Sequence, residues 1–167
     1  MVDIEAMFHQ VTVDPENRDT LRFIWWKEDT QSGIVFSCRM KVHLVGGVWS
    51  PSCASFALLT TFQDHEQEFC DVVRDTKNNF YVDDLLLSVP NVERAKTVAA
   101  GLRKFMAHGG FRLTKWLCNR KEVLKTLPPS ERAEGVRELH FGGEESTTEQ
   151  ALGVLWNLQR DALAIKL

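Results

Sequence analysis

Two adjacent acids stand between apolar residues in the stretch Asn79-Phe80-Tyr81-Val82-Asp83-Asp84-Leu85-Leu86-Leu87-Ser88. Aspartate is disfavoured in strands and neighbouring like charges repel each other, whereas turns accept aspartate readily. We therefore predict a hairpin of two short strands with Asp83 and Asp84 at its tip. The pair has two interpretations: a plain Asp-Asp turn, or a site for a divalent cation whose charge removes the repulsion.

The segments around this hairpin predict an α+β fold. Apolar patterns predict strands over 2–13, 20–26, 35–45, 111–117, 151–157 and 162–167. Helices are predicted after Ser50 as N-cap with Pro51 in the first helical position, over 66–77, between the cap Asn91 and Gly109, and over 119–127. Residues 130–148 are polar and are predicted to be rich in loops. Helices on one face of an antiparallel sheet would bury the apolar faces of both.

The composition is ordinary for one globular domain. The chain has 167 residues, 20 Lys and Arg against 23 Asp and Glu, and a formal net charge of −3, which does not by itself indicate a nucleic-acid-binding protein. No run of about 18 apolar residues predicts a membrane helix, so no membrane partner is expected. The four cysteines form no Cys-x-x-Cys pair, which favours a reducing interior. The five histidines show no metal-ligand spacing, and none is predicted to be a ligand.

Asp3 is a third acid in an apolar context, between Val2 and Ile4. A strand next to the hairpin would place Asp3 beside Asp83. Three carboxylates at one sheet edge suit two-metal phosphoryl transfer, in which one ion activates the attacking hydroxyl and the other stabilises the leaving oxygen. The sequence makes this convergence an expectation.

Five stretches together resemble the palm motifs of reverse transcriptases, in the palm order. They are Asp3–Phe8 (Asp-Ile-x-x-Met-Phe), Gly46–Ala54, the Tyr-x-Asp-Asp tetrad Tyr81–Asp84, Gly109–Trp116 and Ala151–Trp156. A Tyr-x-Asp-Asp tetrad alone is a weak signal, but five ordered motifs over nearly the whole chain are a strong one. The residues within these motifs resemble those of reverse transcriptases from the Pao/BEL class of LTR retrotransposons.

The resemblance implies an RNA-directed DNA polymerase, in which a primer 3′-hydroxyl attacks the α-phosphate of a deoxynucleoside triphosphate. Asp3, Asp83 and Asp84 would be catalytic acids that hold two Mg²⁺ ions, with Mn²⁺ as a substitute. Lys115 would protonate or neutralise the pyrophosphate. The implied nucleotide-binding residues are Ile4 (through its carbonyl), Phe8 (a steric gate against a 2′-hydroxyl), Gly46, Ser50, Pro51 and Tyr81. Gly153 and Trp156 would shape the primer grip.

The resemblance also implies a larger protein. Residues 1–167 would form a partial palm, an antiparallel sheet with helices on one face, with finger-like strands at about 18–45 and primer-grip strands at about 151–167. Most of the fingers and the thumb would lie elsewhere in a polyprotein that also carries RNase H and integrase. The expected partners are an RNA or DNA template with its primer, and the expected location is the cytoplasm or a retrotransposon particle. The chain alone is expected to be weakly active or inactive.

Two other functions stay open. A non-catalytic relic or a ferredoxin-like RNA-binding module would share the outline of a palm, but such modules stack bases on sheet aromatics and Tyr81 is the only tyrosine. A metal-dependent nuclease would also use paired acids, although the order of the motifs favours polymerisation. The basic stretch 112–125, interleaved with Trp116, suits either a nucleic-acid backbone or a solvated helix face.

Overall fold

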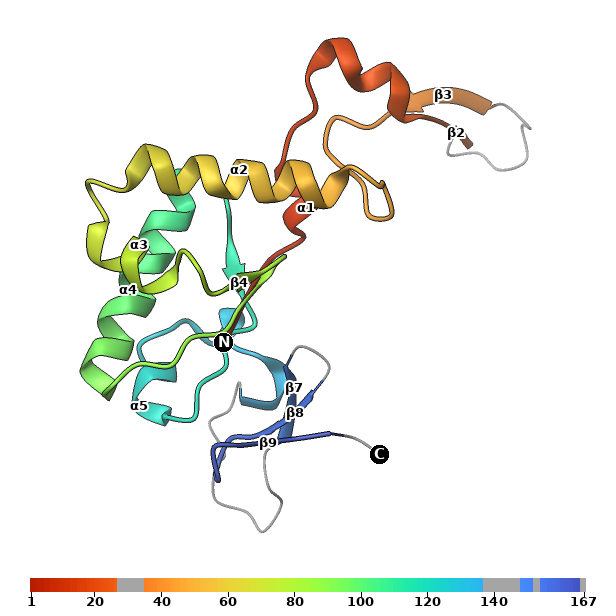
Figure 1. Cartoon of the computed structure of the whole chain (residues 1–167). Helices are drawn as coiled ribbons and strands as arrows, with labels where there is room; N and C mark the ends of the chain where they lie inside the picture. Colours follow the sequence, from red (N-terminus) through yellow and green to blue (C-terminus); the bar gives the residue numbers. More distant parts are fainter. Residues whose placement is uncertain (27–34, 137–147, 152–153, 166–167) are drawn as a thin grey trace. The chain divides into compact units, whose positions relative to one another are not determined.

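The computed structural model of the chain describes residues 1–26, 35–136, 148–151 and 154–165. These residues form helices and antiparallel sheets, which confirms the predicted α+β class (Figure 1). The chain divides into two compact units. The smaller comprises residues 6–58, and the larger comprises residues 1–5 and 59–167.

A four-stranded antiparallel sheet lies in the larger unit, with the strand order β4-β5-β1-β6. Its strands are β1 (Val2–Ile4), β4 (Phe80–Tyr81), β5 (Asp84–Leu85) and β6 (Leu113–Thr114). Successive side chains in a strand alternate between the two faces of a sheet. Val2, Ile4 and Leu85 are buried, whereas the alternating positions Asp3 and Asp84 are only half-buried. The period of two therefore puts the acids on the face opposite the core.

Aromatic side chains form the centre of the core in the larger unit. The helices here are α3 (Cys70–Thr76), α4 (Val92–His108), α5 (Lys121–Leu124) and the end of α2 (Ser50–His65). Figure 1 shows α3 and α4 on one side of the sheet. The rings of Phe62 and Phe105 have their centroids 4.8 Å apart, and Phe80 of β4 lies 5.9 Å from Phe62. The apolar face predicted for α4 is buried at Val98, Ala99, Leu102, Phe105 and Met106.

The ends of α4 are held by different means. Asn91 is the N-cap, as predicted, and its Oδ1 accepts a hydrogen bond of 2.8 Å from the backbone N–H of Arg94. Gly109 follows the helix but has φ −82°, and it is Gly110 that adopts the left-handed conformation, with φ +78°. A Cβ on Gly109 would lie 2.3 Å from Oγ1 of Thr61. Gly109 is thus required by close packing against α2.

Asn91→Ala is expected to lower the free energy of unfolding by about 1 kcal/mol, because it leaves the N–H of Arg94 without its capping acceptor. Urea unfolding followed by circular dichroism measures this loss. Asn91→Ser is the matched control, since a serine hydroxyl can also cap, and it should retain most of the stability. Equal losses in both variants would contradict a capping role.

The smaller unit contains a two-stranded antiparallel hairpin. Its elements are α1 (Met7–Gln10), the 3-10 helix η1 (Pro15–Leu21), β2 (Arg22–Trp26), β3 (Val35–Arg39) and the start of α2. The predicted strands over 20–26 and 35–45 are confirmed in type, although the second ends at Arg39. Asp19 joins the two strands, because its carboxylate pairs with Arg22 at 2.8 Å and with Arg39 at 2.7 Å.

Several predicted boundaries are wrong. The strand predicted over 2–13 stops at Ile4, because Ala6 turns the chain with φ 46° and α1 follows. The strand predicted over 111–117 is reduced to β6, since Lys115 has φ 52° and leaves the sheet. Left-handed conformations are uncommon outside glycine, so neither break is visible in the sequence.

The C-terminal predictions also need correction. The helix predicted over 119–127 is only α5, and the short 3-10 helices η2 (Pro129–Glu131) and η3 (Glu134–Val136) follow it. The strand predicted over 151–157 is two strands, and a three-stranded sheet forms from β7 (Thr148–Ala151), β8 (Val154–Asn157) and β9 (Ala162–Ala164). Most of the loop predicted over 130–148 lies outside the described residues.

Candidate functional site

The register of the sheet brings the three predicted acids together. Asp3 of β1 is directly opposite Asp84 of β5, and directly opposite residues of antiparallel strands share a face. Asp83 lies in the turn between β4 and β5, and its carbonyl accepts a 2.8 Å hydrogen bond from the N–H of Ile4. The turn also contains Val82, whose φ of +55° is unusual for a β-branched residue. The acids therefore gather at one end of the sheet, but Asp84, predicted at the hairpin tip, lies in β5, and Asp3 is opposite Asp84 and not Asp83.

Lys115 joins this cluster. Its Nζ donates a 2.9 Å hydrogen bond to Oδ2 of Asp3, whose side chain is only 16% exposed. The preceding residue, Thr114, lies opposite Asp3 in the β1–β6 pair. Lys115 thus leaves the sheet directly after the residue that pairs with Asp3. Its ammonium group offsets part of the negative charge of the three acids.

The charges in the cluster act on one another. Burial raises the pKa of Asp84 above its ordinary value, and the charges of Asp83 and Asp3 raise it further. The hydrogen bond to Asp3 raises the pKa of Lys115, and the charges of all three acids add to this shift. The three acids and Lys115 therefore interact electrostatically with one another.

The three acids do not converge as closely as the ligands of a single metal ion usually do. Among the described residues, these three acids do not form a group whose ligand atoms all lie within 4.8 Å of one another. Mg²⁺ takes oxygen ligands and usually only one or two carboxylates, so this donor set is compatible with it.

Asp84→Asn is expected to stabilise the folded chain at neutral pH in metal-free buffer. A carboxyl group whose pKa is raised by folding binds its proton more tightly in the folded state, so its ionised form costs stability above that pKa. The gain should stay below about 1 kcal/mol, because solvent screens a half-exposed group. It should shrink as the pH falls through the folded pKa of Asp84 and vanish below its ordinary value of about 3.9.

Urea unfolding of both proteins over a pH series measures this effect. Asp64→Asn, at an exposed position of α2, is the control and should change stability little at any pH. A destabilised Asp84→Asn protein at neutral pH would show that the Asp84 carboxylate is a stabilising group instead.

The remaining predicted nucleotide-binding residues divide between the two units. Ile4 and Tyr81 lie in the larger unit with the acids: Ile4 is fully buried, so only its backbone could reach a ligand, and Tyr81 is 69% exposed. The other four lie in the smaller unit: Phe8 in α1, the exposed Gly46 with φ +88°, and Ser50 and Pro51 in the first turn of α2.

The predicted capping role of Ser50 is wrong. The first helical bond of α2 runs from the N–H of Cys53 to the carbonyl of Trp49, so the helix begins one residue earlier than predicted. Ser50 is fully buried, and its Oγ has no hydrogen-bond partner among the described residues. A buried hydroxyl of this kind cannot contact a nucleotide without local opening.

Of the two residues predicted for the primer grip, the structure describes Trp156. Trp156 lies in β8, and its Nε1 donates a 3.0 Å hydrogen bond to Oδ1 of Asp161. It lines a cavity of about 630 Å³ in the larger unit, together with Leu86 and Trp116 among others. Gly153 lies outside the described residues. Trp116, which interleaves with the basic stretch 112–125 in the sequence, is only 7% exposed.

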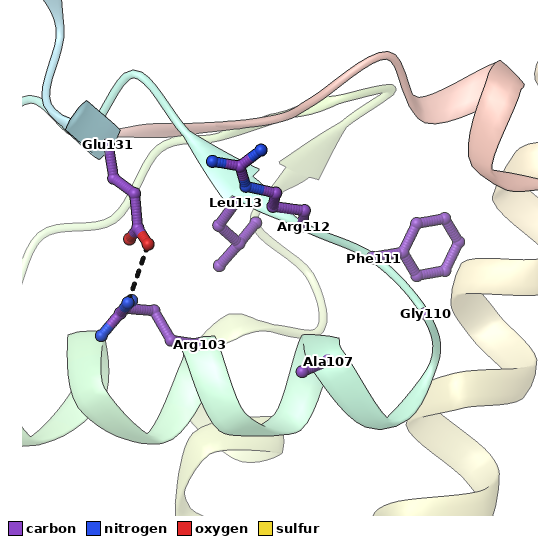
Figure 2. Close-up of a pocket in the computed structure, with 7 residues that line it drawn as sticks. All are labelled: Arg103, Ala107, Gly110, Phe111, Arg112, Leu113 and Glu131. Carbon is purple, nitrogen blue, oxygen red and sulfur yellow. Dashed lines mark hydrogen bonds and ion pairs between the residues drawn. The ribbon is translucent and has the colours of Figure 1, made fainter. Parts of the chain in front are cut away.

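A pocket that the sequence does not predict lies beside β6. It has a volume of about 320 Å³, and Figure 2 shows Arg103 of α4 and Glu131 of η2 meeting within it. Nη2 of Arg103 lies 2.8 Å from Oε1 of Glu131, and Arg112, on the same pocket wall, pairs with Glu5 at 2.9 Å. None of the predicted site residues lines this pocket. The partners of both ion pairs are far apart in the sequence, so no regular residue spacing predicts them.

No family model matches the chain, and no curated protein matches its sequence. Within the part of the chain that the structure describes, no helix is long and apolar enough to cross a lipid bilayer.

Proposed function

We propose that the chain is the palm of a reverse transcriptase, which transfers deoxynucleotides to a primer 3′-hydroxyl with the help of two Mg²⁺ ions. The observation that carries the proposal is the strand register, in which Asp3 is opposite Asp84 and Asp83 lies in the adjoining turn. These are the acids that the first and third motifs single out. The match between motif and geometry supports polymerisation over an ordinary Asp-Asp turn.

The roles follow from the chemistry of the side chains. Asp3 and Asp83 would be the main ligands, and Asp84 would add charge beside them. The two ions would activate the attacking hydroxyl and stabilise the leaving oxygen. Lys115, paired with Asp3 at 2.9 Å, would exchange Asp3 for the pyrophosphate, and the 68% exposure of its side chain leaves it open to such a ligand.

Primer extension by the full chain tests the proposal. The chain is used in excess over a labelled DNA primer on an RNA template, with Mg²⁺ or Mn²⁺ and deoxynucleoside triphosphates. We expect slow, metal-dependent addition of nucleotides that EDTA and Asp3→Asn abolish and that Asp64→Asn leaves intact. Addition that survives Asp3→Asn would contradict the proposal.

Two further outcomes of this experiment favour the alternative functions. Shortening of the primer in place of extension would indicate a metal-dependent nuclease. RNA binding that persists in EDTA and without the three acids, with no extension, would indicate an RNA-binding module. Tyr81, exposed and opposite Asp84, is the aromatic residue that such a module would place on this face.

A further inference from the structure

We propose that His65, Glu68 and His108 form a Zn²⁺ site that joins the end of α2 to the end of α4. Each of these residues offers one ligand atom, and the three atoms all lie within 4.8 Å of one another. They belong to α2, α4 and the turn after α2, and not to the strands and turn that carry the acids, and they have no part in the proposed polymerase chemistry. Sequence spacing does not predict this group, because His65 and His108 belong to different helices.

The buried aromatic core fixes the positions of the two histidines. Phe62 and Phe105 are essentially fully buried and pack with their ring centroids 4.8 Å apart. His65 and His108 lie three residues further along α2 and α4, and residues three apart are neighbours on one helix face. The two imidazoles therefore meet one turn beyond the phenylalanines, with ring centroids 5.0 Å apart. The absence of a side chain at Gly109 permits this close approach, since a Cβ there would meet Thr61.

The third ligand is held by the turn between α2 and α3. Glu68 precedes Phe69, whose N–H donates a 3.1 Å hydrogen bond to the carbonyl of His65. The Phe69 ring packs edge-on against Phe105, at 5.7 Å, and against His108, at 5.3 Å. The backbone beside Glu68 is thus attached to both helices, which keeps its carboxylate near the imidazoles.

The chemistry of the ligands selects the metal. Two imidazoles and one carboxylate suit Zn²⁺, whereas Mg²⁺ prefers oxygen ligands alone. Ligand atoms in a tetrahedral zinc site with bonds of about 2.1 Å are roughly 3.4 Å apart, so ligand atoms that lie within 4.8 Å of one another need to close by at most about 1.4 Å. Glu68 and His108 are exposed and His65 is half-buried, so side-chain rotation can supply this closure. A water molecule would take the fourth position.

Isothermal titration of the untagged full chain with ZnCl₂ tests the proposal. Excess Mg²⁺ is kept in the buffer to occupy the acid cluster. We expect one Zn²⁺ per chain, and at least tenfold weaker binding for His65→Ala, Glu68→Gln and His108→Ala. His9→Ala removes an exposed histidine of the smaller unit and should bind Zn²⁺ as the unmodified chain does.

Cobalt substitution identifies the ligands independently. Co²⁺ in this site should show tetrahedral absorption without the charge-transfer band of a thiolate. A thiolate band, or Zn²⁺ binding that survives the double change His65→Ala/His108→Ala, would overturn the proposal, as would no binding at millimolar Zn²⁺. Asp83→Asn should leave Zn²⁺ affinity unchanged, so failure of the proposed polymerase function and failure of this site are separate results.

Discussion

Asp83→Asn is expected to abolish strong Mg²⁺ or Mn²⁺ binding and to lower metal-dependent nucleotide transfer about a thousandfold. Metal ions contribute several kcal/mol to stabilising a phosphoryl-transfer transition state, and each 1.4 kcal/mol is a tenfold change in rate. Asparagine keeps the shape of the turn but lacks the charge. Asp3 is already partly neutralised by Lys115, so the cluster depends strongly on the charge at position 83.

Calorimetric titration with Mn²⁺, followed by primer extension, measures both effects. Lys115→Met is an informative control, because this change removes a cation that competes with the metal for Asp3 and leaves all three acids in place. Since an exposed ion pair is worth less than about 1 kcal/mol, this variant should bind Mn²⁺ up to a few-fold more tightly. Unchanged Mn²⁺ affinity in the double variant Asp83→Asn/Asp84→Asn would show that the acids hold no metal.

Phe105→Ala is expected to lower the free energy of unfolding by about 3–5 kcal/mol, the range for buried Phe→Ala changes in protein cores. Phe105 is fully buried and its ring packs against both Phe62 and Phe69. Whole domains are stable by only about 5–15 kcal/mol, so this one change removes a large share of the total. It also removes the contact that positions the ends of α2 and α4.

Urea unfolding at neutral pH measures the loss. Lys104→Ala, at the adjacent exposed position of α4, should change stability by no more than about 0.5 kcal/mol. Phe105→Leu keeps part of the buried apolar surface, so its loss in the free energy of unfolding should lie between those of Phe105→Ala and Lys104→Ala. A loss below about 1 kcal/mol for Phe105→Ala would mean that this core relaxes around the cavity, contrary to the packing described above.

Local chemistry made several elements predictable. The spacing of Val98, Leu102 and Phe105 predicts the buried face of α4, because a helix repeats every 3.6 residues. Asn91 predicts where α4 begins, since its short side chain can accept the first free N–H. The hairpin around Asp83 follows from the preference of aspartate for turns. All of these depend on interactions between residues close together in the chain.

The sequence by itself thus determined the α+β class, the helix α4 with its N-cap, and a turn at Asp83. Only the tertiary structure decided that Asp3 lies opposite Asp84 and that His65 meets His108. It also decided that Ala6 and Lys115 leave their strands with positive φ. The physical reason is that strand register and helix contacts are set by burial of the whole core, which joins residues distant in sequence and can impose local conformations that their own preferences oppose.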